Sequence, residues 1–85
     1  MYKLRITIFG GKRWDGKKFN AIPYTYHEEE YKPVTSDFEF EEKANRIINE
    51  KYPSTGHKGE TTQANYLITN DDGFICDYRG DLVSD

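Results

Sequence analysis

The sequence predicts a small α+β domain in the order β-β-α-β-β, with one four-stranded, mainly antiparallel sheet and a single helix packed on one face. Three observations support this fold class. Only residues 36–52 repeat apolar side chains with a helical period, the segments on either side alternate apolar and polar residues, and turn-forming residues separate those segments. A chain of 85 residues is the size of one domain, so we expect a single domain over residues 1–85.

The helix is expected to run from Ser36 to Tyr52. Ser36, with Glu39 three residues later, has the spacing of a capping box, and Pro53 stops the helix after Tyr52. The apolar residues recur at the spacing of one helical face, namely Phe40, Ala44, Ile47 and Ile48. Residues 34–40 also alternate, so a short strand that runs into the helix is the alternative for its first turn.

The strands are expected at residues 2–8, 19–27, 64–69 and 74–79. In the second strand, Ile22, Tyr24 and Tyr26 are expected on one face. Pro23 lacks a ladder donor and places this strand at an edge or at a bulge. Turns are expected at residues 11–18 and 70–73, residues 28–32 are expected to lead into the helix, and residues 81–85 are expected to fray.

No catalytic residue, cofactor or metal site is expected. Residues 11–17 match G-x-x-x-x-G-K, but Lys18 replaces the hydroxyl residue of a phosphate loop and a strand follows where a helix is needed. Residues 70–73 lack the further ligands of a calcium loop. His27, His57 and Cys76 match no zinc spacing, and Cys76 on an alternating strand is most simply a core thiol.

Charge is distributed unevenly along the chain. Residues 1–18 contain six Lys or Arg and one Asp, whereas residues 19–85 contain six Lys or Arg and fourteen acids. Residues 28–42 contain seven acidic residues and a single basic residue, Lys32. Solvated surface that keeps a small domain soluble is the simplest explanation of both stretches. The alternatives are a basic partner for the acidic stretch and phosphates for the basic stretch.

The first functional hypothesis is therefore a non-enzymatic module that binds a larger protein, one that itself handles nucleic acid. Its expected contact residues are acidic or aromatic: Glu28, Glu29, Glu30, Asp37, Glu41, Glu42, Tyr24, Tyr26 and Tyr31. The second hypothesis is binding of nucleic acid or a phosphorylated ligand by the basic hairpin, through Lys12, Arg13, Trp14, Lys17 and Lys18. The third is a small self-associating structural protein, since a single helix leaves one sheet face for a partner or for a second copy in a homodimer.

In size, acidity and lack of catalytic motifs the chain resembles the small inhibitors and regulators encoded by phages and mobile elements, such as anti-CRISPR proteins. The resemblance is one of type and covers no specific motif. It implies an inhibitor that acts by contact. The single Cys76, the charged residues within the first strand and the lack of a long apolar run predict a cytoplasmic protein with no membrane partner.

Overall fold

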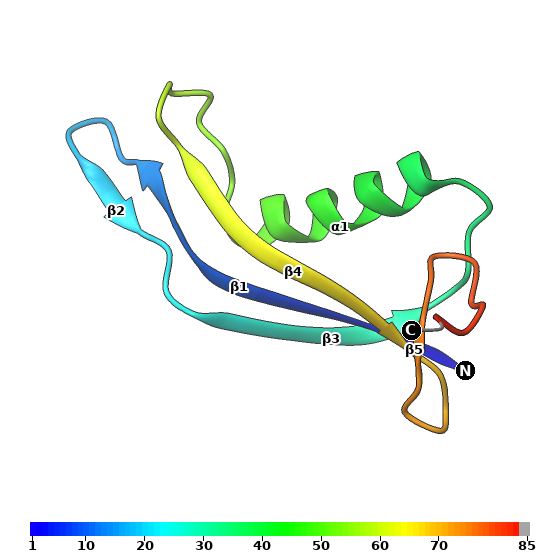
Figure 1. Cartoon of the computed structure of the whole chain (residues 1–85). Coiled ribbons are helices and arrows are strands. Elements are labelled where there is room, and N and C mark those ends of the chain that lie inside the picture. The colour runs from blue at the N-terminus through cyan, green and yellow to red at the C-terminus, as the bar shows by residue number, and fades with distance from the viewer. Residues whose placement is uncertain (84–85) are drawn as a thin grey trace.

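The computed structural model describes residues 1–83 and contains one antiparallel sheet of five strands with a single helix against one face (Figure 1). The elements are β1 (Tyr2–Trp14), β2 (Phe19–Ala21), β3 (Thr25–Tyr31), α1 (Asp37–Lys51), β4 (Thr61–Thr69) and β5 (Ile75–Cys76). The α+β class with one helix on an antiparallel sheet is confirmed. Five strands occur instead of four, because the segment expected as the second strand is divided in two.

Strand β1 lies at the centre of the sheet. Along one edge its first half pairs with β3 and its last three residues pair with β2. Along the other edge it pairs with β4, and β5 adds a short strand beyond β4. Figure 1 shows the sheet curling toward α1, so the helix lies on the concave side of the sheet.

The core lies between α1 and the alternate residues of β1. Leu4, Ile6 and Ile8 are fully buried there. From the helix, the expected apolar face packs onto them, with Ala44, Ile47 and Ile48 buried and Phe40 partly buried. The other buried members of the core are Ile22, Tyr31, Ile68 and Cys76. Cys76 is therefore the core thiol that the sequence predicts.

Both ends of the helix agree with the prediction. Ser36 is the N-cap, and its Oγ accepts a hydrogen bond from the Glu39 N–H at 3.0 Å. At the other end, the Tyr52 N–H donates to the Ile48 carbonyl at 2.8 Å, and Pro53 follows. The strand that was the alternative for the first turn is absent, since residues 34–36 are outside any strand.

The first strand is longer than expected. The sequence predicts an end at Gly10 and Gly11, but β1 continues to Trp14. The pairing register with β4 shifts between Ile8 and Gly10, so Phe9 is an extra residue in a bulge. Gly11 then adopts a φ of 136°, a conformation that side chains rarely allow. The two glycines thus bend the strand instead of ending it.

The second expected strand is interrupted at Pro23. β2 ends at Ala21 and β3 begins at Thr25. Ile22 is buried in the core, whereas Tyr24 and Tyr26 are exposed, so the prediction that these three residues share a face is wrong. β3 then continues through residues 28–31, which were expected to be a polar connection, because they pair in register with the first residues of β1.

Two further boundaries differ from the prediction. β4 begins at Thr61 instead of Ala64, and the last strand contains only Ile75–Cys76. A turn over residues 77–81 replaces the rest of the expected last strand, since the Asp77 carboxylate accepts the N–H groups of Arg79 and Asp81. Residues 81–83 are held by a bridge between Cys76 and Leu82 and do not fray, while residues 84–85 lie outside the described residues.

Candidate functional site

The acidic stretch from residue 28 to residue 42 does not form a single surface. Its first three acids lie on β3, at the edge of the sheet, and the others lie on α1. Alternation along a strand also divides the first three. Glu28 and Glu30 lie opposite Arg5 and Lys3 on the face away from the helix, and Glu29 lies opposite Leu4 on the helix side.

The glutamates of β3 are largely engaged within the chain. Glu28 lies 3.3 Å from both Lys3 Nζ and Arg5 Nε and accepts the Tyr26 hydroxyl at 2.7 Å. The Tyr26 hydroxyl, followed by Lys3, holds the pKa of Glu28 below its usual value. Glu29 Oε1 lies 2.7 Å from His27 Nε2. Charged residues on an exposed edge strand also discourage pairing with another chain, which gives these acids a structural role.

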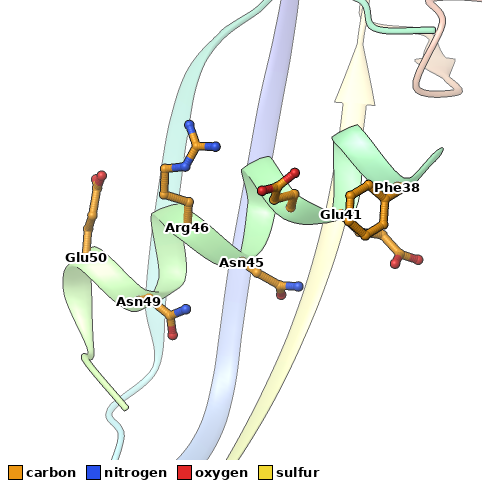
Figure 2. Close-up of a pocket in the computed structure, with 7 residues that line it drawn as sticks. Phe38, Glu41, Asn45, Arg46, Asn49 and Glu50 are labelled. Carbon is orange, nitrogen blue, oxygen red and sulfur yellow. The ribbon is translucent and has the colours of Figure 1, made fainter. Parts of the chain in front are cut away.

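The acids of α1 are differently placed. Glu41 and Glu42 line a shallow hollow on the outer side of the helix, together with Phe38, Asn45, Arg46, Asn49 and Glu50. Figure 2 shows the labelled side chains of this hollow along α1, in front of the strands. Among residues 1–83, no ion pair within 4.0 Å involves an acid of this surface. Asp37 is exposed at the first position of the helix and does not line the hollow.

Phe38 is the apolar residue of this outer surface. Its side chain is 75% exposed, the highest value among the large hydrophobic residues of the described chain. We define the outer acidic surface as Phe38, Glu41, Glu42, Asn45, Arg46, Asn49 and Glu50. The sequence did not single out Phe38, because its place between two acids fits either the first helical turn or the alternating alternative.

The expected tyrosines have two different environments. Tyr31 is 2% exposed and donates its hydroxyl to the Tyr78 carbonyl at 2.8 Å, so it belongs to the core and corrects the expectation of a contact residue. Tyr24 and Tyr26 are 67% and 52% exposed. Phe9, which the sequence missed, is 56% exposed, and its ring lies 6.2 Å from that of Tyr24. The bulge in β1 explains this position, since Phe9 is the extra residue.

The basic hairpin ends in an aromatic cluster. Trp14 stacks on His57 with 4.2 Å between ring centroids, and Phe19 packs edge-on against both rings. Lys12 Nζ lies 4.7 Å from the centre of the Phe19 ring. Trp14 is therefore at the end of β1 and partly buried.

Arg13 differs from the other cations of the hairpin. Its guanidinium donates to the Tyr52 carbonyl at 3.2 Å, the Thr61 carbonyl at 2.8 Å and Thr62 Oγ1 at 2.7 Å. It thus joins the end of α1 to the start of β4, a structural role that the sequence did not predict. Because Arg13 points to the helix side, its neighbours Lys12 and Trp14 point to the opposite face.

The tip of the hairpin presents Lys17 and Lys18. The Asp15 carboxylate accepts the backbone N–H groups of both lysines and the Asn20 amide, each at 2.8 Å. The Lys18 and Lys17 N–H groups and then the Asn20 amide lower the pKa of Asp15. No ion pair within 4.0 Å engages either ammonium group in the described part of the chain. The two charges are exposed at this tip.

Glu60 organises the loop that covers Trp14. One carboxylate oxygen accepts the Trp14 N–H at 3.0 Å, and the other accepts the Ser54 hydroxyl and the N–H groups of Thr55 and Gly56. Desolvation alone would raise the pKa of Glu60, but these donors, led by the Trp14 N–H, outweigh it and lower the pKa to about 2. The carboxylate is therefore ionised at neutral pH and holds residues 54–60 beside the aromatic cluster.

The candidate chemical residues do not converge on a cavity. His27 contacts Glu29 at 2.7 Å, but the two are neighbours on the edge strand. Neither lines the hollow on the outer side of α1 or the hollows beside Lys32 and Arg13 in the described part of the chain. His57 stacks on Trp14, and Cys76 is buried in the core. Over residues 1–83, no group of three or more His, Cys, Asp or Glu side chains is arranged to hold a metal ion.

No helix within the described residues has both the length and the apolar character required to cross a membrane. Comparison of the chain with models of protein families, with curated proteins and with solved structures gives no match.

Proposed function

We propose that this protein is a non-enzymatic binding module that inhibits or regulates a larger protein, and that it contacts this protein through the outer acidic surface of α1. The exposed ring of Phe38 carries the proposal, because it lies on a regular helix among acids that have no cation within ion-pairing distance in residues 1–83. An aromatic anchor surrounded by charged residues has the composition of a binding hot spot with a polar rim.

The two kinds of side chain have different tasks in this proposal. Burial of a phenylalanine side chain stabilises a complex by roughly 1.5–3 kcal/mol, so Phe38 supplies affinity. The three acids of the surface, against Arg46 alone, attract a basic partner and increase the rate of association more than the affinity. A helix that exposes both is suited to a groove with an apolar pocket and basic walls.

The partner is expected to be a protein that handles nucleic acid. Proteins that bind phosphate backbones carry basic stripes, and an acidic helix complements such a stripe. Occupation of that stripe would exclude the nucleic acid, which is the mode of action of an inhibitor. The size and acidity of the chain agree with this role, as do those of small inhibitors of nucleases.

The test compares two triple variants as baits in lysate of the source cells. The first is Phe38→Ser, Glu41→Lys and Glu42→Lys on α1, and the control is Tyr24→Ser, Tyr26→Ser and Glu30→Lys on the opposite face. All six residues are exposed, so both variants are expected to fold, as a thermal melt will check.

We expect a protein that is retained by the wild type and by the control but lost with the α1 variant. The purified partner should then bind the wild type at least tenfold more tightly than the α1 variant, with an association rate that falls as salt increases. Equal retention by all three baits would contradict the proposal. Loss with the control variant alone would also contradict it, because the partner would then contact the other face.

A further inference from the structure

A second surface lies on the face of the sheet away from α1. Lys12 and Trp14 point to this face, because Arg13 between them points to the helix. The ring of Phe9 lies beside that of Tyr24, and Lys17 and Lys18 are exposed in the turn that follows Trp14. We propose that this aromatic-basic surface, composed of Phe9, Lys12, Trp14, Lys17, Lys18 and Tyr24, binds single-stranded nucleic acid. The proposal concerns residues that the outer acidic surface does not include, so it is independent of the proposed function.

Two aromatic rings are exposed on this surface. Phe9 and Tyr24 are both more than half exposed, although burial of either ring in the core would stabilise the fold. Their rings meet edge to face, with 66° between the ring planes, so they do not cover each other by stacking. Such rings can stack with unpaired bases, and each stacked base strengthens binding by about tenfold.

This end of the sheet carries a positive net charge. Residues 9–24 and 54–65, at this end of the sheet, contain Lys12, Arg13, Lys17, Lys18 and Lys58 against two acids, a net charge of +3. The rest of the chain then carries −6 of the total of −3. Both local acids, Asp15 and Glu60, hold backbone N–H groups and do not pair with the lysines. This positive end of an otherwise acidic protein is complementary to phosphates.

The surroundings of Trp14 are rigid. Trp14 is fixed between His57 and Phe19, and Glu60 ties the covering loop to the Trp14 backbone. Close contact with Phe19 also requires a glycine at position 59, where a Cβ would lie 3.0 Å from the ring. A binding surface that is already ordered loses little conformational entropy when a ligand binds.

These features favour a single strand over a duplex or a protein. Paired bases are stacked on each other and do not offer their faces to aromatic side chains, whereas single strands do. Lysine is depleted in the centres of protein interfaces, yet lysines are interleaved with the aromatic residues here.

The experiment is a fluorescence titration of the whole chain, in which the only tryptophan is Trp14. The probes are oligo(dT), oligo(U) and a duplex, each of about ten nucleotides, in about 50 mM and about 200 mM salt. The test variants are Phe9→Ser with Tyr24→Ser, and Lys12→Gln with Lys17→Gln and Lys18→Gln. Matched controls are Phe38→Ser, and Lys32→Gln with Lys43→Gln and Lys51→Gln.

We expect the single strands to quench Trp14 and to bind more tightly than the duplex. Both test variants should weaken binding at least tenfold, and the lysine variant should also reduce the dependence of log Kd on log salt by about 2, as expected from three lost phosphate contacts. The controls should bind as the wild type does. A response to only one of oligo(dT) and oligo(U) would identify the sugar that is preferred and would still support the proposal.

Three results would overturn it. They are no binding of either single strand in low salt, equal weakening by the test and control variants, and a dimer that the Phe9 and Tyr24 variant dissociates while no oligonucleotide binds. The last result would assign the surface to a second copy of the chain. Loss of the partner protein with the α1 variant, while oligonucleotide binding remains, would separate this inference from the proposed function.

Discussion

Gly11 lies against the backbone of Thr61 so closely that a Cβ on Gly11 would be 2.3 Å from the Thr61 carbonyl oxygen. The same glycine has a φ of 136°. Both facts concern the place where β1 bends, so the curl of the sheet depends on the absence of a side chain at position 11.

Gly11→Ala is therefore expected to lower the free energy of unfolding by about 2–3 kcal/mol, from backbone strain and the clash with Thr61. The measurement is urea denaturation followed by circular dichroism. Gly10→Ala is the matched control, since a Cβ there meets only Gln63 Oε1, at 3.6 Å. Equal effects at the two positions would show that the close approach at Gly11 is unimportant.

The pKa of Glu60 gives a prediction for the dependence of stability on pH. Because this pKa is about 2 in the folded state and near 4.5 in the unfolded state, ionised Glu60 stabilises the fold fully above pH 4.5 and progressively less as pH falls toward 2. Glu60→Gln should thus be less stable than the wild type at pH 7, and the difference should narrow at pH 3.

Urea denaturation at the two pH values measures this difference. Glu50→Gln is the control, because Glu50 is exposed on the outer side of α1 and takes no part in the hydrogen bonds by which Glu60 holds its loop. A difference between the wild type and Glu60→Gln that stays constant with pH would contradict the assignment of the low pKa to the hydrogen bonds of this loop.

Arg13 makes hydrogen bonds that lysine cannot reproduce, because its planar guanidinium reaches Tyr52, Thr61 and Thr62 at once. We expect Arg13→Lys to lower the free energy of unfolding by about 1.5–3 kcal/mol although the charge is kept. Lys12→Arg, which also exchanges one cation for the other, should have a much smaller effect. A stable Arg13→Lys variant would mean that the contacts with the end of α1 are dispensable.

The core offers a fourth prediction. Ile6 is fully buried between the sheet and α1, so Ile6→Ala should lower the free energy of unfolding by about 2–5 kcal/mol. Ile75 is 50% exposed, and Ile75→Ala should change the free energy of unfolding by only about 0.5 kcal/mol. Thermal and urea denaturation of both variants measure the contrast. Similar losses would mean that Ile6 is less tightly packed than its burial indicates.

The sequence predicted the helix well because its signals are local. The cap at Ser36 and the repeat of apolar residues depend on neighbours within a few positions. The end of β1 could not be predicted in the same way. Two consecutive glycines usually mark a turn. Gly10 and Gly11 instead form a bend within a strand, because they pair with residues of β4 that are distant in the chain. Pro23 was expected at an edge or a bulge, and it lies between the two edge strands β2 and β3, where it divides the expected strand in two.

The contrast between local signals and contacts of distant residues also explains which parts of the candidate surfaces could be predicted. Sequence order placed the acids of residues 28–42 together, but strand and helix geometry separates Glu28 and Glu30 from Glu41 and Glu42. The exposure of Phe9 follows from a bulge that has no signature in the residues themselves. Lys12, Lys17 and Lys18 were identified from charge alone. The structural role of Arg13 required knowledge of where α1 ends.

The central position of β1 has a consequence for biosynthesis. This strand is synthesised before the other strands, yet one of its three neighbours, β4, is made only after the helix. Nascent chains that stop before Thr61 would leave one whole edge of β1 and the apolar residues beneath the helix without their final partners. We therefore expect folding only once β4 has been synthesised, in one cooperative step that long-range strand pairing makes slow, and dependence on chaperones whenever translation pauses before Thr61.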